Sequence, residues 1–140
     1  MVSLSKSKII AHRQCPKRLW LQVNKPELIQ ISAATQVRLD EGNKVGDIAR
    51  QNYPGGAFIE TLNRIEAIAL TKEAIAKYQA IFEGAFFEGD VMIRADLLFP
   101  EKEGYRLVEV KSSTGVKSYH VDDVTVQSWV MVSLKRVKHC

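Results

Sequence analysis

The sequence predicts an α/β protein whose central sheet carries helices on its faces. Two observations lead to this prediction. Residues 1–80 combine helix-capping serines with apolar residues at near-helical spacing, whereas from Phe82 onward apolar and polar residues alternate with a period of two. Near the C-terminal end, a strand, a helix and another strand are expected in succession, which is the order of a right-handed crossover.

Three helices are expected before the sheet. The first opens near the N-terminal serines; Pro16 should kink or restart it, and Pro26 should end it. The second should run through residues 32–53 and stop at the Pro-Gly-Gly sequence that follows. The third, over residues 62–81, has the clearest pattern, because isoleucine and alanine recur at near-helical spacing among good helix formers.

Three strands should follow as a meander. Residues 81–99 have the pattern of two strands joined by a short turn at Gly89 and Asp90. Residues 105–112 have the pattern of the third strand, which a Ser/Thr/Gly turn signal follows.

A further helix is expected over residues 119–134. Asp122 or Asp123 would be its N-cap, where a carboxylate also suits the positive end of the helix dipole. Residues 135–140 are expected to begin another strand.

Length and composition limit the possible classes of protein. The chain has 140 residues, of which 46% are apolar, and this is enough for a single core. We expect one domain over residues 1–140, mainly helical over 1–80 and with the sheet and one helix over 81–140, either complete or a fragment of a longer chain. No apolar run is long enough to cross a bilayer and no secretory signal is present, so we expect a cytoplasmic protein without a membrane partner.

Basic residues dominate the N-terminal segment of a chain whose net charge is +4. Such a segment would attract phosphates or another anionic surface; a solvated helix face is the alternative interpretation. Six basic residues precede Glu27, the first acidic residue: Lys6, Lys8, Arg13, Lys17, Arg18 and Lys25.

Two charged residues, Glu109 and Lys111, lie two apart in the third predicted strand. Side chains alternate across a strand, so both would share one face while Val108 and Val110 point to the other. An ordinary ion pair on a solvated edge strand is one explanation. The other involves Asp96, an acid in the otherwise apolar middle strand, whose burial would require a cation, a donor or water.

A meander would bring Asp96 near Glu109 at the strand ends. Two carboxylates with other oxygen donors suit a hard divalent cation such as Mg²⁺ or Mn²⁺. Lys111 could then position or deprotonate a water molecule beside the metal, or stabilise charge that develops on a phosphate. Glu83, at the start of the first strand, is a further candidate ligand; a charged residue at a strand mouth is the alternative interpretation.

The spacing of Asp96 and the sequence Glu109-Val110-Lys111 resembles the core of the PD-(D/E)XK nuclease superfamily. Two further features resemble its RecB-like branch, which includes the CRISPR-associated RecB-like exonucleases. These are the N-terminal sequence LSKSKIIAHRQCPKRLWL and Gln127, which stands where the branch has the Gln of its Q-x-x-x-Y motif. The resemblance is closest to an uncharacterised bacterial group in which this RecB-like module begins a longer chain. It covers nearly the whole chain and implies a restriction-endonuclease-like core, with a mixed central sheet flanked by helices.

The resemblance also implies residue roles. Asp96 and Glu109 would be metal ligands, the carbonyl of Val110 would complete the shell, and Lys111 would be the catalytic lysine.

The resemblance also suggests roles for three polar residues near the last predicted helix. Gln127 would orient the catalytic lysine or contact the DNA backbone. His120 and Asp123 flank the site and would bind phosphate or metal, although N-capping explains Asp123 equally well.

The sequence departs from the RecB-like pattern at several positions. Met131 stands where the motif has its Tyr, and Gly46 stands where many members carry a metal-binding His; Asp47 or Glu83 would be the substitute for that His. Some members hold an iron-sulfur cluster on four cysteines. Here only Cys15 and Cys140 are present, so no such cluster is expected within this chain, and Cys15 is expected to be a small buried apolar residue.

The leading hypothesis is therefore a Mg²⁺- or Mn²⁺-dependent nuclease that contacts the DNA backbone without reading its sequence. The second is a nuclease-fold module of weak or no activity that binds nucleic acid or a protein partner. The third treats the three central residues as surface charges with a structural role only. A homo-oligomer, or a further domain of a longer chain, is an additional expected partner.

Overall fold

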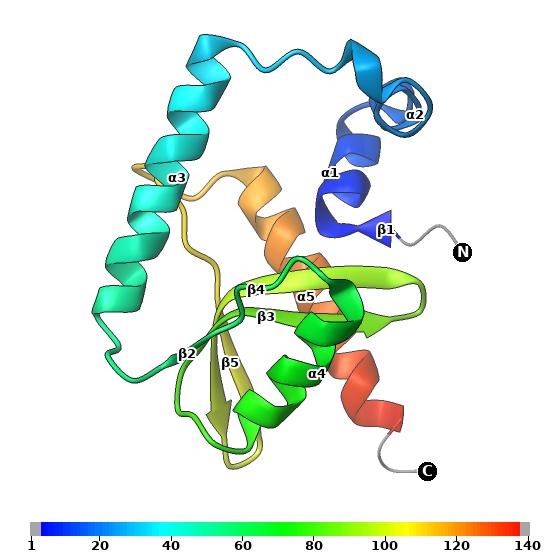
Figure 1. The fold of residues 1–140 in the computed structure, drawn as a ribbon. Coiled ribbons are helices and arrows are strands. Elements are labelled where there is room, and N and C mark those ends of the chain that lie inside the picture. Colours follow the sequence, from blue (N-terminus) through cyan, green and yellow to red (C-terminus); the bar gives the residue numbers. More distant parts are fainter. Residues whose placement is uncertain (1–3, 138–140) are drawn as a thin grey trace.

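A computed structural model describes residues 4–137, with side chains described through Leu134. It is an α/β fold with a mixed, curled sheet flanked by helices, as predicted (Figure 1). In chain order the elements are β1 (Leu4–Ser5), α1 (Lys6–Gln14), α2 (Pro16–Asn24), the 3₁₀ helix η1 (Pro26–Leu28), α3 (Ala33–Gln51), β2 (Ala57–Phe58), α4 (Arg64–Ile75), β3 (Ile81–Glu88), β4 (Val91–Glu101), β5 (Gly104–Val108) and α5 (Ser118–Val137).

The long strand β4 organises the sheet. One of its edges pairs antiparallel with β3, and β2 pairs parallel with the far edge of β3. The other edge of β4 is shared by two strands. β1 runs parallel to it at residues 91–92, and β5 runs antiparallel to it at residues 97–101. Because β1 and β5 run toward each other along this edge, their C-terminal ends meet beside residues 93–96 of β4.

Helices α4 and α5 pack against the sheet and enclose the main core. Small or branched side chains allow this close packing of helix on sheet. The fully buried members include Ala67 from α4, Val130 from α5, and Ile81, Ile93, Ala95 and Leu98 from the sheet. A smaller cluster joins Ala80, Phe82, Leu97 and Phe99 with the half-buried Val108.

Helices α2 and α3 contribute no buried residue to this core. In Figure 1, α3 stands apart from the sheet at the left, and an extended segment connects it to α2 and η1. Side chains of α3 and of the sheet line a cleft between them.

Several sequence predictions are confirmed. The first helix is interrupted at Cys15, whose backbone is extended, and Pro16 begins α2 because a proline fits the first helical turn. The strands β3 and β4 form the predicted hairpin. Gly89 and Asp90 have φ of 51° and 65°, the two positive values that a tight type I′ turn requires.

Other predictions about the helices are wrong in part. The third helix is shorter than predicted, and Ile65 is 82% exposed, because Ala67, Thr71 and Ala74 form its buried side instead. The last helix begins at Ser118, so neither Asp122 nor Asp123 is its N-cap.

The prediction of a strand over residues 135–140 is also wrong for residues 135–137, the part that the structure describes. Residues 135–137 continue α5, and residues 138–140 lie outside the described residues. The strand β5 ends at Val108, so residues 109–112 lie beyond it. The strands β1 and β2 were not predicted, since two residues are too few to show a period.

Candidate functional site

The candidate site forms where the ends of β1 and β5 meet beside β4. The last β4–β5 pair joins Leu97 to Val108, so one step further along the sheet Asp96 lies level with Glu109. The amide of Val110 donates a hydrogen bond to Asp96 Oδ2 at 2.8 Å. The predicted proximity of Asp96 and Glu109 therefore follows from strand register.

Four charged side chains form an alternating ring beside Asp96. Lys111 Nζ lies 2.5 Å from Glu109 Oε1 and 3.0 Å from Asp123 Oδ2. Lys6 Nζ lies 3.1 Å from the same Glu109 Oε1 and 3.0 Å from Asp123 Oδ1. Each ammonium group thus bridges the same two carboxylates, and each carboxylate contacts two ammonium groups.

Helix α5 supplies the polar residues that close the site. His120, Asp123 and Gln127 recur at helical spacing and are buried, and Val130 and Met131 continue this buried side into the core. The buried side of α5 is therefore polar over the meeting point of the strands and apolar beyond it.

The side chain of Gln127 is completely buried and fixes Glu109. Its Nε2 donates to Glu109 Oε2 at 2.6 Å and lies 3.5 Å from Asp123 Oδ1. Its Oε1 has no hydrogen-bond partner within the described part of the chain. The reversed amide would point an oxygen at two carboxylates, so the donor must face Glu109.

Burial rules out one explanation of Glu109 and Lys111. The Glu109 side chain is only 5% exposed, so the two residues are not an ordinary ion pair on a solvated edge strand. A buried carboxylate requires partners of this kind, because an unpaired charge would be costly.

The protonation equilibria of the cluster differ from those of exposed groups. Burial and the neighbouring Glu109 carboxylate raise the pKa of Asp96 to about 6, and the amide of Val110 offsets part of this effect. Burial lowers the pKa of Lys111, but its hydrogen bonds to Glu109 and Asp123, and their charges, outweigh burial and raise that pKa. Burial likewise raises the pKa of Asp123, and Lys6 together with Lys111 outweighs it and lowers that pKa. Asp96 is thus the carboxylate of the cluster whose charge is least compensated.

The donor set suits a small divalent cation better than a metal that needs a full protein cage. Asp96 and Glu109 offer hard oxygen atoms, and Mg²⁺ is typically held by one or two carboxylates while it keeps several waters. Among residues 4–137, no group of three or more His, Cys, Asp or Glu side chains is arranged to hold a metal. A cation between Asp96 and Glu109 would also supply the charge that Asp96 lacks.

A cleft of 870 Å³ separates α3 from the sheet and leads to the site. Asp96, Val110 and Lys111 line its sheet side. On the opposite side it is lined by α3, including Arg38, Leu39, Gly42, Asn43, Gly46, Asp47 and Arg50. A second cleft of 780 Å³ is lined by Glu109, Lys111, His120 and the 113–116 turn, so Lys111 borders both.

Glu83 and Asp47, the other candidate acids, line the α3 cleft but are each paired with an arginine. Glu83 has a positive φ of 56° and its Oε2 lies 3.4 Å from Arg94 Nε. Asp47 pairs with Arg50, which lines the same cleft. Gly46 lines the same cleft and places no side chain there.

The basic residues of the N-terminal segment do not form one surface. Lys6 is drawn into the charged ring, whereas Arg13 Nη2 pairs with Asp122 Oδ1 at 3.1 Å. Lys8 is half-buried, and Lys17 and Arg18 are exposed on α2.

His120 has a structural contact that the sequence did not reveal. Its Nδ1 accepts a hydrogen bond from the amide of Lys117 at 3.1 Å, next to the first turn of α5. Its ring also meets Tyr119 edge to face, with centroids 4.4 Å apart.

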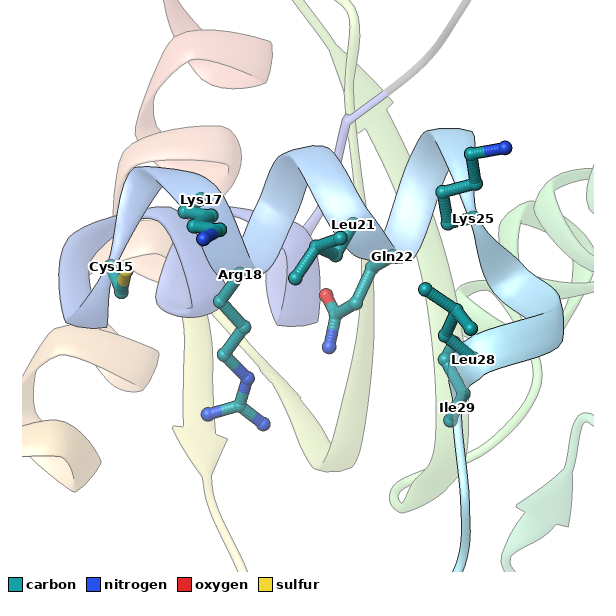
Figure 2. Close-up of a pocket in the computed structure, with 8 residues that line it drawn as sticks. All are labelled: Cys15, Lys17, Arg18, Leu21, Gln22, Lys25, Leu28 and Ile29. Atoms are coloured by element: carbon teal, nitrogen blue, oxygen red, sulfur yellow. The ribbon is translucent and has the colours of Figure 1, made fainter.

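Cys15 is exposed, so the expectation of a buried residue is wrong. It follows α1, at the extended break before a helix that buries none of its residues. Figure 2 shows the shallow pocket of 290 Å³ at this place, where Arg18 and Gln22 extend from α2 toward the side on which Leu28 and Ile29 lie.

The place of Lys6 in this cluster was not predicted from the sequence. The signal was present only as the serine cap: Ser5 Oγ accepts from the amide of Lys8 at 3.3 Å, and this cap makes Lys6 the first residue of α1. The contribution of the α3 wall was missed because it depends on a helix that stands away from the sheet.

Comparison with known proteins adds no relative: no family model, curated protein or solved structure matches the chain. None of the helices within residues 4–137 is long and apolar enough to cross a bilayer.

Proposed function

We propose that this chain is a divalent-metal-dependent nuclease that hydrolyses DNA phosphodiester bonds at Asp96, Glu109 and Lys111. The observation that supports it best is a pair of neighbouring carboxylates, the half-buried Asp96 on β4 and the nearly buried Glu109 just beyond β5, with Lys111 on Glu109. Bound Mg²⁺ or Mn²⁺ would polarise the phosphate and acidify a water molecule. The restriction-endonuclease-like core and the RecB-like identity belong to this proposal.

Lys111 acts as a cation in this mechanism. Its contacts with Glu109 and Asp123 raise its pKa, so it stays protonated at neutral pH and does not remove a proton from water. An ammonium group that borders both clefts can instead stabilise negative charge on a phosphate in either one. Gln127 holds Glu109 in place through Oε2, and Asp123 orients Lys111.

The α3 cleft is the proposed path of the substrate. Arg38 and Arg50 lie on its α3 side, opposite Asp96 and Lys111, where they would contact the backbone phosphates next to the scissile bond. Lys17 and Arg18 on α2 would extend this contact without reading bases.

A second candidate is a module of the same fold that binds nucleic acid without cleaving it. The observation that favours it is that Lys6, Lys111 and Gln127 already contact both oxygens of Glu109. A metal ion would have to compete with these groups for the carboxylate. The two functions share a binding surface and differ only in turnover.

Cleavage of an end-labelled DNA strand in Mg²⁺ or Mn²⁺, with and without a chelator, tests the proposal. We expect metal-dependent cleavage that falls by on the order of a hundredfold or more in Asp96→Ala, Glu109→Ala and Lys111→Ala. Retained DNA binding without any cleavage by the wild-type protein would instead support the binding module.

Two matched controls keep this experiment specific. Glu101→Ala removes an exposed acid of β4 that pairs with Arg106, and Lys77→Ala removes an exposed lysine beyond α4. Both should cleave as the wild type does. Equal losses in controls and site variants would contradict the assignment of Asp96, Glu109 and Lys111.

A further inference from the structure

Strand pairing with β4 places Lys6 in the site, as it does Glu109. The amide of Leu4 donates to the carbonyl of Asp90 at 2.9 Å, and β1 pairs with the start of β4. Lys6 follows at once as the first residue of the capped helix α1, and its side chain is only 20% exposed. This lysine is therefore part of the site rather than of a solvated helix face.

The two oxygens of Glu109 are fully engaged by four contacts. Oε1 contacts the ammonium groups of Lys6 and Lys111, at 3.1 and 2.5 Å. Oε2 accepts from Gln127 at 2.6 Å and from Lys6 at 3.4 Å. A carboxylate has about four lone-pair directions, so a metal ion can bind Glu109 only if a present donor leaves.

We propose that Lys6 is a built-in competitor for the divalent cation, which occupies Glu109 in the metal-free protein and is displaced from it when the cation binds. This inference rests on the proposed metal site at Asp96 and Glu109, but not on hydrolysis of DNA. Lys6 is the donor that leaves because its contacts with Glu109 are the longest of the four. It keeps Asp123 Oδ1, at 3.0 Å, as a partner after it leaves.

The charge of the cluster predicts the direction of the effect. Three carboxylates and two ammonium groups carry one net negative charge, and the loss of Lys6 leaves two. A divalent cation is then attracted more strongly and displaces no competitor. Removal of a residue with a structural role only would weaken metal binding or leave it unchanged, so tighter binding shows that the Lys6 ammonium group opposes the cation at Glu109.

Calorimetric titration of Mn²⁺ into metal-free protein tests this inference. We expect Lys6→Met to bind Mn²⁺ about tenfold more tightly than the wild type, a difference of about 1.4 kcal/mol. Lys6→Gln, which removes the charge but keeps a polar side chain, should show the same gain and serves if the first variant does not fold. Thermal unfolding of each variant checks that it is folded.

Lys8→Met is the matched control, because Lys8 has the same charge on the same helix and makes no ion pair in the described part of the chain. Its affinity should stay within about twofold of the wild type, since Glu109 and Asp123 pair with Lys6 and Lys111 and not with Lys8. Equal or weaker binding by both Lys6 variants, or an equal gain in Lys8→Met, would overturn the inference.

Cleavage of labelled DNA by the same samples separates the two proposals. If the Lys6 variants bind Mn²⁺ more tightly but no sample cleaves DNA, the proposal about Lys6 is supported and the proposed nuclease activity is contradicted. If the wild type cleaves DNA but the Lys6 variants do not bind Mn²⁺ more tightly, only the proposal about Lys6 is contradicted. If no sample binds Mn²⁺, both proposals are contradicted, because each requires a cation at the site.

Discussion

Lys6 Nζ lies 3.1 Å from Glu109 Oε1, although 103 positions separate the two residues in the chain. The contact exists because each residue directly follows a strand, β1 or β5, and both strands share one edge of β4. The cluster is therefore assembled by the sheet from segments near the two ends of the chain. Substitution of a charged residue in the cluster should therefore change both the free energy of unfolding and the pKa values of its neighbours.

Asp96 should make the metal-free protein less stable as the pH rises. Burial and Glu109 raise its pKa in the folded state to about 6, against a reference value of 3.8. The neutral acid is favoured by folding, so this contribution is present below pH 4 and is lost as the pH rises through 6. Between pH 4.5 and 7, urea denaturation should show a loss of about 1–3 kcal/mol relative to Asp96→Asn.

The same window separates Asp96 from its neighbours. The lowered pKa of Asp123 gives a contribution that is lost only as the pH falls below the usual range of aspartate, and Lys111 titrates far above neutral pH. A wild-type protein and an Asp96→Asn variant with parallel stability profiles from pH 4.5 to 7 would contradict the raised pKa.

Gln127→Leu should destabilise the protein by about 1–3 kcal/mol, because it removes a donor from the nearly buried Glu109. Chemical denaturation measures this loss. Gln36→Leu is the control, since Gln36 bonds Asp40 on the exposed surface of α3. A loss in the control as large as that in Gln127→Leu would mean that the hydrogen bond to Glu109 contributes nothing specific.

Thr71 should link α4 to β3 through its hydroxyl group. This buried Oγ1 donates to the carbonyl of Ala67 at 2.7 Å and accepts from the amide of Ala85 at 2.9 Å. Thr71→Val leaves the Ala85 amide without its partner and should cost about 1–3 kcal/mol, whereas Thr71→Ser keeps the hydroxyl and should cost less. Thermal unfolding that ranks the serine variant below the valine variant would be inconsistent with this link.

Two glycines should respond in opposite directions to alanine. At Gly56, an added Cβ would lie 2.6 Å from Phe82 Cε2 and 3.1 Å from the carbonyl oxygen of Ala80. Gly56→Ala should therefore destabilise the protein by about 1–3 kcal/mol. At Gly42 no atom lies within 4 Å, and Gly42→Ala should stabilise α3 by up to about 1 kcal/mol. Similar unfolding midpoints for both variants would argue against this packing at β2.

Local patterns in the sequence were sufficient to predict the hairpin and the meander. Gly89 and Asp90 both tolerate positive φ, glycine because it has no Cβ and aspartate because its side chain is short and polar, and the alternation on either side fixes the strands. Because a meander sets neighbouring strands in register, the approach of Asp96 to Glu109 followed from the same local signals.

The rest of the cluster depends on contacts that no local pattern contains. Lys6 reaches Glu109 through a parallel pairing of only two residues. Asp123 was interpreted as a cap because the helix was expected to start later than it does. Its true place within α5 sets it beside Lys111, at 3.0 Å.

Equilibrium binding of Mn²⁺ to the metal-free protein shows whether Asp96 holds a cation, with Asp96→Asn as the variant and Glu101→Gln as the control. Asparagine keeps an oxygen for the amide of Val110 but removes the charge. We expect one Mn²⁺ per chain, at least about tenfold weaker binding in Asp96→Asn, and no change in Glu101→Gln. Identical isotherms for all three proteins would show that Asp96 does not hold a cation, and would contradict the proposed site.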